Sequence, residues 1–365
     1  MPATTTHRAF NFSAGPCTLP TPVLERLADE LPDYQGSGVG VVEMSHRSKE
    51  VVAIFDEATA LVRELLDVPD THEVLFVAGG ATFQFGMLAM NFLGPDQHAD
   101  YTHSGAWAKK AVADAKTQGT VNLIYDGGPD YMSLPDPAEV AATPGAQYLH
   151  LTSNETIGGV QWKAFPKVDV PLVADMSSDI LSRPIDAAPF GLIYAGAQKN
   201  IGPAGATLLI LRKDMLDRDL PRPLTNYLSY ANHVKGESML NTPPVFSVYA
   251  MKYVLEWLRE QGGVAWAQRQ AGVKSKLVYD AIAAAPGMYR CPVDERYRST
   301  MNVVFTLPSD ELTDAFIKGA TAEGMPGLKG HRSVGGARAS LYNAMPVEGA
   351  KALSDYMTDF AAKHA

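Results

Sequence analysis

Short apolar runs alternate with helical patterns through the first two thirds of the chain. The run at residues 74–78 (VLFVA) ends at Gly79 and Gly80 and leads into an apolar helical segment that ends near Leu93. Similar runs bounded by turn residues, which are typical of buried strands, occur at 121–125, 147–151, 170–174, 192–195 and 207–211. Between residues 50 and 66 the apolar side chains recur every three or four positions, which predicts an amphipathic helix. This alternation predicts an α/β domain whose mostly parallel sheet is buried on both faces.

The last third of the chain has a different pattern. Two long helical stretches, 246–261 and 264–285, are separated by Gly262 and Gly263. After them we expect a strand at 301–306, a helix at 310–323, a strand at 338–342 and a helix at 346–362. Strands and helices joined by short loops in this way predict an α+β domain.

The length of the chain allows two separate cores. It has 365 residues, of which 46% are hydrophobic, enough for one large and one smaller domain. We expect the large domain at 15–262 and the small C-terminal domain at 263–365, with the N-terminal segment 1–14 packed near the small domain.

The charge balance argues against some classes of protein. The formal net charge is -9, from 31 basic and 40 acidic residues, whereas a nucleic-acid or membrane-surface binder needs a basic face. No stretch of roughly 18 uncharged apolar residues indicates a membrane span. The two cysteines, Cys17 and Cys291, are too few for a disulfide framework, and the histidines show no metal-ligand spacing. We therefore expect a soluble cytoplasmic protein that binds no metal, nucleic acid or membrane.

Lys199 is the only charged side chain between Asp186 and Arg212. Its neighbours in AGAQKNIGPAG are small, and an apolar run lies on either side of them. A surface lysine usually lies among other polar residues, so burial explains this one better. A lysine in an apolar setting has a lowered pKa, which frees its amine for attack on a carbonyl group. The pattern predicts Schiff-base chemistry at Lys199.

A Schiff-base lysine that serves pyridoxal phosphate needs a carboxylate to keep the pyridine nitrogen protonated. Asp175 is the candidate, because it ends the apolar run VPLVA, and open α/β sheets bind ligands at the carboxyl ends of their strands. A helix N-cap or a turn aspartate explains this position equally well on local grounds.

Two further segments suit the same cofactor. Residues 79–82 (GGAT) follow a strand and open a helix, so their backbone amides can bind a phosphate, although they lack the spacing of a nucleotide-binding P-loop. Trp107 in YTHSGAW is a candidate for an aromatic ring stacked on the pyridine. Taken alone, a tryptophan is more often a core residue.

Two His-Arg pairs, His46-Arg47 and His331-Arg332, lie in loops that contain Gly or Ser. Exposed surface explains either pair taken alone. Arg338 follows Gly335 and Gly336 and begins a predicted strand, a rigid place for an anchoring residue. Together the three arginines suit a substrate with two anionic ends.

Many segments of the chain resemble the phosphoserine aminotransferase family. The two narrowest matches are AGAQKN at Lys199 and KGHRSVGGARASLYN from Lys329. The others are NFSAGPCTLP, EMSHRSKE, GGATFQF, SNETIGG, DMSSDILSRPID and LNTPP. They follow one another in the order expected of the family and extend over nearly the whole chain.

The resemblance implies a fold-type I, aspartate-aminotransferase-like pyridoxal-phosphate enzyme of class V. Such enzymes work as homodimers with active sites at the subunit interface. The resemblance implies that Lys199 carries the cofactor, Asp175 pairs with the pyridine nitrogen and Trp107 stacks on the ring. The further cofactor contacts that it implies are Thr156 at the phenolic edge, Gln198 and the amides of Ala81 and Thr82 at the phosphate, and Asn241 and Thr242 from the neighbouring subunit.

The substrate contacts also come from the resemblance. It implies that Arg338 holds the substrate's α-carboxylate through the paired hydrogen bonds that a guanidinium favours. It further implies that the distal phosphate or carboxylate is bound by His46 and Arg47, together with His331 and Arg332 of the partner subunit.

The implied reaction is a reversible ping-pong transamination. Glutamate would give its amino group to 3-phosphohydroxypyruvate, forming 2-oxoglutarate and phosphoserine for serine biosynthesis. Family members also act on the 4-phosphohydroxythreonine pair in vitamin B6 synthesis. The chain departs from the pattern at Thr82, where some members carry arginine, and at Ala14, where others carry serine. Both departures bear on substrate affinity and neither touches the cofactor chemistry.

Three alternatives remain open at this point. An alanine–glyoxylate-type aminotransferase would not need the two His-Arg pairs. A cysteine desulfurase needs a reactive cysteine on a mobile loop, and neither cysteine is obviously placed for that. A binding protein without catalysis would leave the isolated Lys199 without a purpose.

Overall fold

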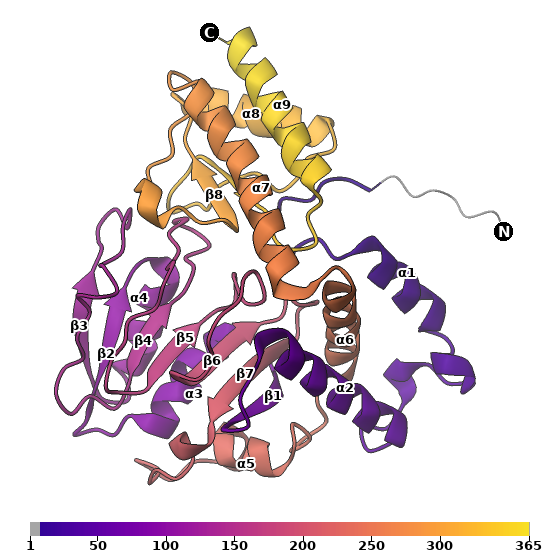
Figure 1. Cartoon of the computed structure of the whole chain (residues 1–365), viewed down its shortest axis with the longest axis vertical. Coiled ribbons are helices and arrows are strands. Elements are labelled where there is room, and N and C mark those ends of the chain that lie inside the picture. Colours follow the sequence, from indigo (N-terminus) through magenta and orange to yellow (C-terminus); the bar gives the residue numbers. More distant parts are fainter. Residues whose placement is uncertain (1–7, 365) are drawn as a thin grey trace.

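The computed structural model describes residues 8–364. Seven strands of this part form one sheet in the order β1-β7-β6-β5-β4-β2-β3 (Figure 1). Their bounds are β1 (His72–Ala78), β2 (His98–His103), β3 (Thr120–Asp126), β4 (Leu149–Thr152), β5 (Leu172–Asp175), β6 (Phe190–Gly196) and β7 (Ala206–Arg212). The strands from β3 to β6 run parallel to their neighbours, whereas β7 is antiparallel to both β6 and β1. The sheet is therefore mostly parallel, and the predicted α/β class is confirmed.

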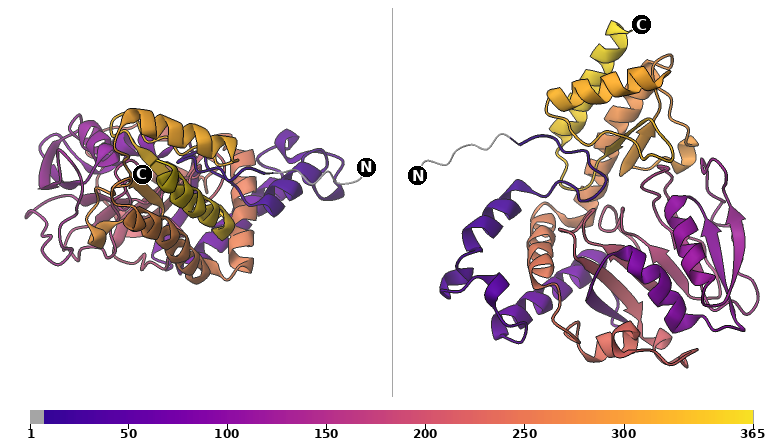
Figure 2. Two further views of the ribbon diagram at one scale, coloured as in Figure 1. Left: turned by 90° about the horizontal axis from the view of Figure 1, so that it is seen from above. Right: turned by 180° about the vertical axis from the view of Figure 1, so that it is seen from behind.

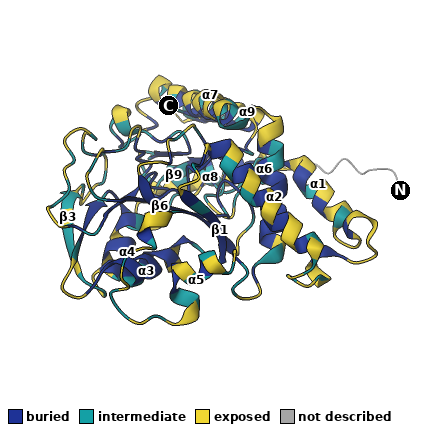
Figure 3. Ribbon diagram, turned by 60° about the horizontal axis from the view of Figure 1, so that its bottom comes forward, coloured by how far each residue is buried: buried dark blue, intermediate teal, exposed yellow. Residues whose placement is uncertain are grey.

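Helices cover both faces of this sheet. Helices α2 (Lys49–Leu66) and α6 (Val245–Glu260) pack on one face, and α3 (Ala81–Phe92), α4 (Ala106–Ala115) and α5 (Tyr230–Lys235) pack on the other. In β7, Leu208 and Ile210 belong to the first core, while Leu209 and Leu211 belong to the second. Successive side chains of a strand point to opposite faces, so a continuous apolar run serves both cores. Figure 3 shows the buried strands between partly exposed helices.

A second group of elements lies beyond the ends of the strands of the large sheet (Figures 1 and 2). Helix α7 (Gly263–Ala284) follows α6 and packs with α8 (Asp310–Ala322) and α9 (Val347–Lys363) around the antiparallel pair β8 (Asn302–Phe305) and β9 (Ala337–Ser340). These elements share a core of their own, which includes Val278, Phe305, Phe316 and Leu353.

The N-terminal segment contacts the core of this C-terminal group of elements. Phe12 is buried in it, and the Phe10 amide donates to the carbonyl of Gly324 at 2.9 Å. Helix α1 (Thr21–Glu30) then leads to the large sheet's side of the molecule. The predicted domain boundary at residue 262 stays a prediction. Residues 1–7 of the predicted N-terminal segment and residue 365 of the predicted small domain lie outside the described part.

Most of the predicted elements are confirmed, but four were missed: β2, α1, α4 and α5. Strand β2 has the sequence HADYTH, whose polar Asp100 and Thr102 hide its burial, and α4 begins after Gly105 without a local side-chain cap. Short 3₁₀ helices occupy connecting loops at Tyr34–Gly36, Val41–Glu43, Lys213–Met215, Asn226–Leu228 and Glu295–Tyr297. No helix within residues 8–364 has the length and apolar character needed to cross a membrane.

Candidate active site

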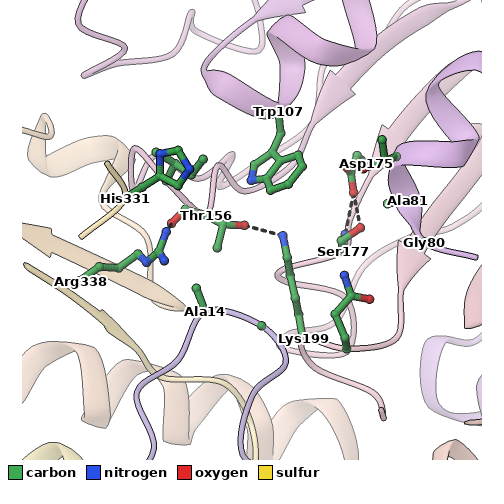
Figure 4. Close-up of a pocket in the computed structure, with 14 residues that line it drawn as sticks. Ala14, Gly80, Ala81, Trp107, Thr156, Asp175, Ser177, Lys199, His331 and Arg338 are labelled. Atoms are coloured by element: carbon green, nitrogen blue, oxygen red, sulfur yellow. Dashed lines mark hydrogen bonds between the residues drawn. The ribbon is translucent and has the colours of Figure 1, made fainter. Parts of the chain in front are cut away.

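A pocket of about 280 Å³ opens at the carboxyl edge of the large sheet. Strands β1, β2, β4, β5 and β6 all end there, because they point the same way. The segments that follow them line the pocket. Ligands of open α/β sheets bind at this edge. The lining residues are Ala14, Gly15, Gly80, Ala81, Thr82, Trp107, Thr156, Ile157, Asp175, Ser177, Gln198, Lys199, His331 and Arg338 (Figure 4).

Lys199 lies at the centre of the pocket, in the turn between β6 and β7. Its Nζ atom donates to the hydroxyl of Thr156 at 2.6 Å and lies 5.0 Å from the centre of the Trp107 ring. The side chain is buried, and burial lowers the pKa of Lys199 while Asp175 and Glu155 oppose that change. A buried amine with a lowered pKa is a nucleophile and a proton acceptor at lower pH than an ordinary lysine.

Asp175 ends β5 and faces the pocket. Ser177 holds its Oδ1 atom with two hydrogen bonds, one from the backbone N–H at 2.9 Å and one from the hydroxyl at 2.6 Å. Burial raises the pKa of Asp175, whereas Lys199 and Ser177 lower it. These contacts fix the carboxylate in one orientation and leave its second oxygen for a further partner.

The start of α3 forms the next wall. Gly79 has a φ of 97°, which a residue with a side chain would adopt only under strain, and it turns the chain from β1 into the helix. The N-cap residue Gly80 has no side chain to cap the first N–H groups, which belong to Ala81 and Thr82. Free N–H groups at a helix start bind anions, so this wall suits a phosphate.

Arg338 and His331 lie on the opposite side of Lys199 from Asp175, as Figure 4 shows. The Arg338 Nη1 atom donates to the carbonyl of Thr156 at 3.2 Å, and its buried Nε has no partner within the described residues. Burial lowers the pKa of His331, and so do three nearby cations, Arg338, Arg332 and Lys110. A positive field of this kind favours an anionic group at this end of the pocket.

The resemblance placed His331 in the site of the partner subunit, whereas here it lines the pocket of its own chain. The loop between residues 329 and 337 folds back on itself, because the Gly330 amide donates to the Gly336 carbonyl at 2.9 Å. The Arg338 amide also bonds to Leu328, at 2.8 Å. His331 is thereby held close to Arg338.

Five other predicted site residues do not line this pocket: His46, Arg47, Asn241, Thr242 and Arg332. All of them are exposed except His46, which is partly buried. The pair at 46 and 47 lies in the loop before α2, and Asn241 and Thr242 lie before α6. The structure of the single chain brings together the predicted cofactor contacts around Lys199 but leaves these residues apart from it.

Three residues near the pocket had no predicted role. Ser177 follows Asp175 by two positions, and an aspartate that bonds to the backbone two residues on is a known turn signal. Lys110 lies one turn after Trp107 in α4, with its Nζ atom 4.2 Å from the centre of that ring. Glu155, inside the segment SNETIGG, is fully buried beside the start of α4, and no local signal indicated that contact.

Comparison with known proteins gives a consistent result. The model of the family described as aminotransferase class-V matches residues 9–353. A phosphoserine aminotransferase of Nitrosomonas europaea is 47% identical over 98% of this chain and 100% of its own length.

Solved structures agree. The phosphoserine aminotransferase from Bacillus circulans subsp. alkalophilus has a TM-score of 0.95 and 48% identity, covering 98% of this chain and 99% of that one. The PLP-bound phosphoserine aminotransferase from Trichomonas vaginalis has a TM-score of 0.88 and 38% identity, covering 96% and 99%. These proteins share the fold of the chain over nearly its whole length.

Proposed function

The chain belongs to the class-V aminotransferases and, within them, to the phosphoserine aminotransferase family, and from this premise we propose its substrates and its cofactor site. We propose that it catalyses the reversible transfer of an amino group from glutamate to 3-phosphohydroxypyruvate, which gives 2-oxoglutarate and phosphoserine. The cofactor is pyridoxal 5'-phosphate, bound in the Lys199 pocket. The observation that carries this proposal is a buried amine between a fixed carboxylate on one side and a guanidinium on the other.

The residues of the pocket fit this cofactor. Lys199 offers a buried amine for its aldehyde, Asp175 a carboxylate for its ring nitrogen, and the first turn of α3 N–H groups for its phosphate. The Trp107 ring forms an apolar wall, and its buried Nε1 atom lacks a partner within residues 8–364. Thr156 and Gln198 complete the set that we propose to hold the cofactor.

When bound, pyridoxal phosphate supplies an aldehyde that condenses with amines and a ring that withdraws electrons from the substrate's α-carbon. Lys199 would then act as general base and acid, taking the proton from the substrate's α-carbon at Nζ and delivering it to the carbon that was the cofactor's aldehyde. Its lowered pKa favours the neutral amine that this role requires. The hydroxyl of Thr156 orients that amine from 2.6 Å away. Asp175, which Ser177 holds in place, would pair as a carboxylate with the protonated ring nitrogen.

The side of the pocket opposite Asp175 has the groups that we propose to bind the substrate. Arg338 has a buried Nε without a protein partner in the described part of the chain, so its guanidinium can hold an α-carboxylate. Arg332 supplies positive charge for a distal phosphate or carboxylate, and His331, whose pKa is lowered by burial and by the nearby cations, offers a neutral imidazole as a hydrogen-bond donor. Phosphoserine, 3-phosphohydroxypyruvate, glutamate and 2-oxoglutarate all carry two anionic ends, whereas alanine and glyoxylate carry one.

A second subunit would complete the site. We propose a homodimer in which Asn241 and Thr242 reach the cofactor phosphate of the neighbouring site. Because His331 lines the pocket of its own chain, we propose that His46 and Arg47 reach the distal group from the partner subunit, which reverses the arrangement that the resemblance implies. Arg47, Asn241 and Thr242 are exposed in the single chain and available for such a contact. We further propose that the enzyme works in the cytoplasm in serine biosynthesis.

Activity on the 4-phosphohydroxythreonine pair, in vitamin B6 synthesis, is a second proposal. The pocket is lined by the small side chain of Ala14 where relatives carry serine, and by Thr82 where some carry arginine. Both side chains are smaller than those that they replace, and we propose that they accommodate the additional hydroxyl-bearing carbon of this substrate. The alternative of an alanine–glyoxylate-type aminotransferase is disfavoured by the positive charge around His331.

The cofactor assignment is tested on purified protein. We expect added pyridoxal phosphate to produce a visible absorbance band, and borohydride to attach the cofactor covalently to Lys199, as peptide mapping would show. A colourless protein that takes up no pyridoxal phosphate would overturn the assignment.

The substrate assignment is tested with Arg332→Ala. We expect kcat/KM for phosphoserine to fall about tenfold or more, which corresponds to the loss of a hydrogen bond to a charged group. Any rate with alanine should change little. Arg296→Ala, which removes an exposed arginine paired with Asp294, is the matched control. Equal losses for both substrates would contradict the role of Arg332.

A further inference from the structure

Glu155 is a buried carboxylate that the proposed reaction does not use. Its side chain is 0% exposed. Its Oε2 atom accepts the backbone N–H of Trp107 at 3.1 Å, and its Oε1 atom accepts that of Ala108 at 2.9 Å. Both carboxylate oxygens therefore accept hydrogen bonds from the first turn of α4.

Helix α4 depends on this contact for its cap. Its N-cap residue is Gly105, which has no side chain to accept the N–H groups of the first turn. Glu155, from 47 residues along the chain, takes the place of a local cap and adds a negative charge where the helix dipole favours one. The fit is close, since a methyl group at Gly105 would stand 2.5 Å from the carboxyl carbon of Glu155.

The next residue, Thr156, makes two contacts in the pocket. Its hydroxyl accepts from Lys199 at 2.6 Å, and its carbonyl accepts from Arg338 at 3.2 Å (Figure 4). Two consecutive residues therefore bind the backbone of Trp107, the central amine and the guanidinium. A shift of this dipeptide would move all three relative to one another.

The turn that carries the dipeptide is itself fixed. The Glu155 amide donates to the Val160 carbonyl at 2.9 Å, and the Gly159 amide donates back to the Glu155 carbonyl at 2.8 Å. Asn154 bonds through Nδ2 to the side chain of Asn302, in β8, at 2.8 Å. The turn is thus bonded to itself and to β8 of the C-terminal group, so it holds the Glu155 carboxylate rigidly.

We infer that Glu155 is a positioning residue, whose carboxylate sets the start of α4 and through it the orientation of the Trp107 ring against Lys199 and Arg338. The inference rests on the proposed function for what the ring contacts during the reaction. The hold of Glu155 on α4 does not depend on that function.

The hydrogen bonds from α4 to Glu155 should depend on pH, because they depend on the charge of the Glu155 carboxylate. Burial raises its pKa to about 7, its two N–H donors lower it, Asp175 raises it and Lys199 lowers it. Of these charges, Asp175 lies at the end of β5 and Lys199 in the turn after β6. Tyr131, in the loop after β3, is the third neighbour, and its pKa is raised by burial, by Asp126 and by Glu155. A protonated carboxyl has one oxygen that no longer accepts well, so the hold should weaken below pH 7.

The test is amide hydrogen exchange of the purified protein in the segment 104–112. Glu155→Gln keeps the shape of the side chain but turns one acceptor into a donor. We expect the amides of Trp107 or Ala108 to exchange about tenfold or more faster than in the wild type. Glu311→Gln, which changes an exposed carboxylate in the first turn of α8, is the matched control and should leave this segment unchanged. Equal exchange in Glu155→Gln and the wild type would overturn the inference.

A second readout separates positioning from mere stability. We expect Glu155→Gln to raise the Kd for pyridoxal phosphate about tenfold and to alter the visible circular dichroism of the bound cofactor. Faster exchange with an unchanged Kd and spectrum would reduce Glu155 to a helix cap and overturn the positioning role. A wild-type protein that binds no pyridoxal phosphate would refute the proposed function, while the exchange data would still decide whether Glu155 holds α4.

Two further measurements serve if Glu155→Gln does not fold. Gly105 has a φ of 166°, an extended conformation that alanine adopts freely, so Gly105→Ala acts only by pushing on the Glu155 carboxylate. We expect it to speed the same exchange. In the wild type, protection of this segment, corrected for intrinsic rates, should rise between pH 6 and pH 8. Unchanged exchange in Gly105→Ala together with constant protection across this range would overturn the inference.

Discussion

Lys199 and Lys274 are both buried lysines, yet they lie in regions with different tasks. Their side chains are 8% and 1% exposed, and burial lowers the pKa of both, that of Lys274 to about 7. Lys199 faces the hydroxyl of Thr156, two carboxylates and an open pocket. Lys274, in α7, donates to the carbonyls of Tyr342 and Met345 at 2.7 and 2.9 Å.

The comparison shows that a lowered lysine pKa does not by itself identify a catalytic lysine. Lys274 joins α7 to the loop between β9 and α9, and the hydrogen bonds that it makes are those of a structural cross-link. Lys199 becomes a reactive group because free volume, an acid and an aromatic ring surround the same amine. A third buried lysine, Lys252, pairs with Glu57 and Glu256, which reach solvent.

The largest expected difference between the two regions is in turnover. We expect Lys199→Ala to lower kcat for phosphoserine by about 10³-fold or more, because general acid–base catalysis alone contributes about 10²- to 10⁴-fold. Lys274→Met should retain most of the turnover at 25 °C. Steady-state kinetics of both variants, after a check of folding by far-UV circular dichroism, decide the matter. Comparable losses in the two variants would break the distinction.

The second expected difference is in the pH dependence of stability. The folded-state pKa of Lys274 is about 7 against an ordinary 10.5, so between these values the unfolded chain holds a proton that the folded one lacks. The free energy of unfolding should therefore gain up to about 1.4 kcal/mol per pH unit from this group as the pH rises through that range. Below pH 7 both states hold the proton and the gain is absent.

Lys274→Met removes this contribution. We expect urea unfolding at pH 7 and pH 9 to show a smaller rise in stability for the variant than for the wild type. At pH 9 the variant should also be less stable, because the carbonyls of Tyr342 and Met345 lose their donor, at a cost of about 1–3 kcal/mol. An identical rise in both proteins would show that Lys274 does not titrate in this range.

The smallest expected effect belongs to Lys252. Glu57 is 54% exposed on its side chain, and Glu256 keeps a second partner in Arg26 at 2.9 Å. We expect Lys252→Met to cost about 1 kcal/mol or less in unfolding free energy, with turnover unchanged. The difference in unfolding free energy between the wild type and Lys252→Met should be smaller in 1 M NaCl, because salt screens ion pairs that reach solvent. A loss of several kcal/mol would place Lys252 with Lys274 as a structural cross-link.

The sequence by itself determined the α/β class, most of the strands and helices, and the central place of Lys199. These follow from local patterns, since a continuous apolar run serves two cores and a lone charge within such runs must be buried. It also indicated Asp175 and the Gly79 turn, because strand ends of a parallel sheet converge on one edge.

Only the tertiary structure decided which groups meet across long stretches of chain. The cap of α4 comes from Glu155, so no pattern near Gly105 predicted that helix. Lys274 lies among polar residues in the sequence, and its burial arises only when α7 packs against the loop at Tyr342. A side chain's charge and orientation depend on the partners that packing brings to it, and those partners are set by long-range contacts that local patterns do not record.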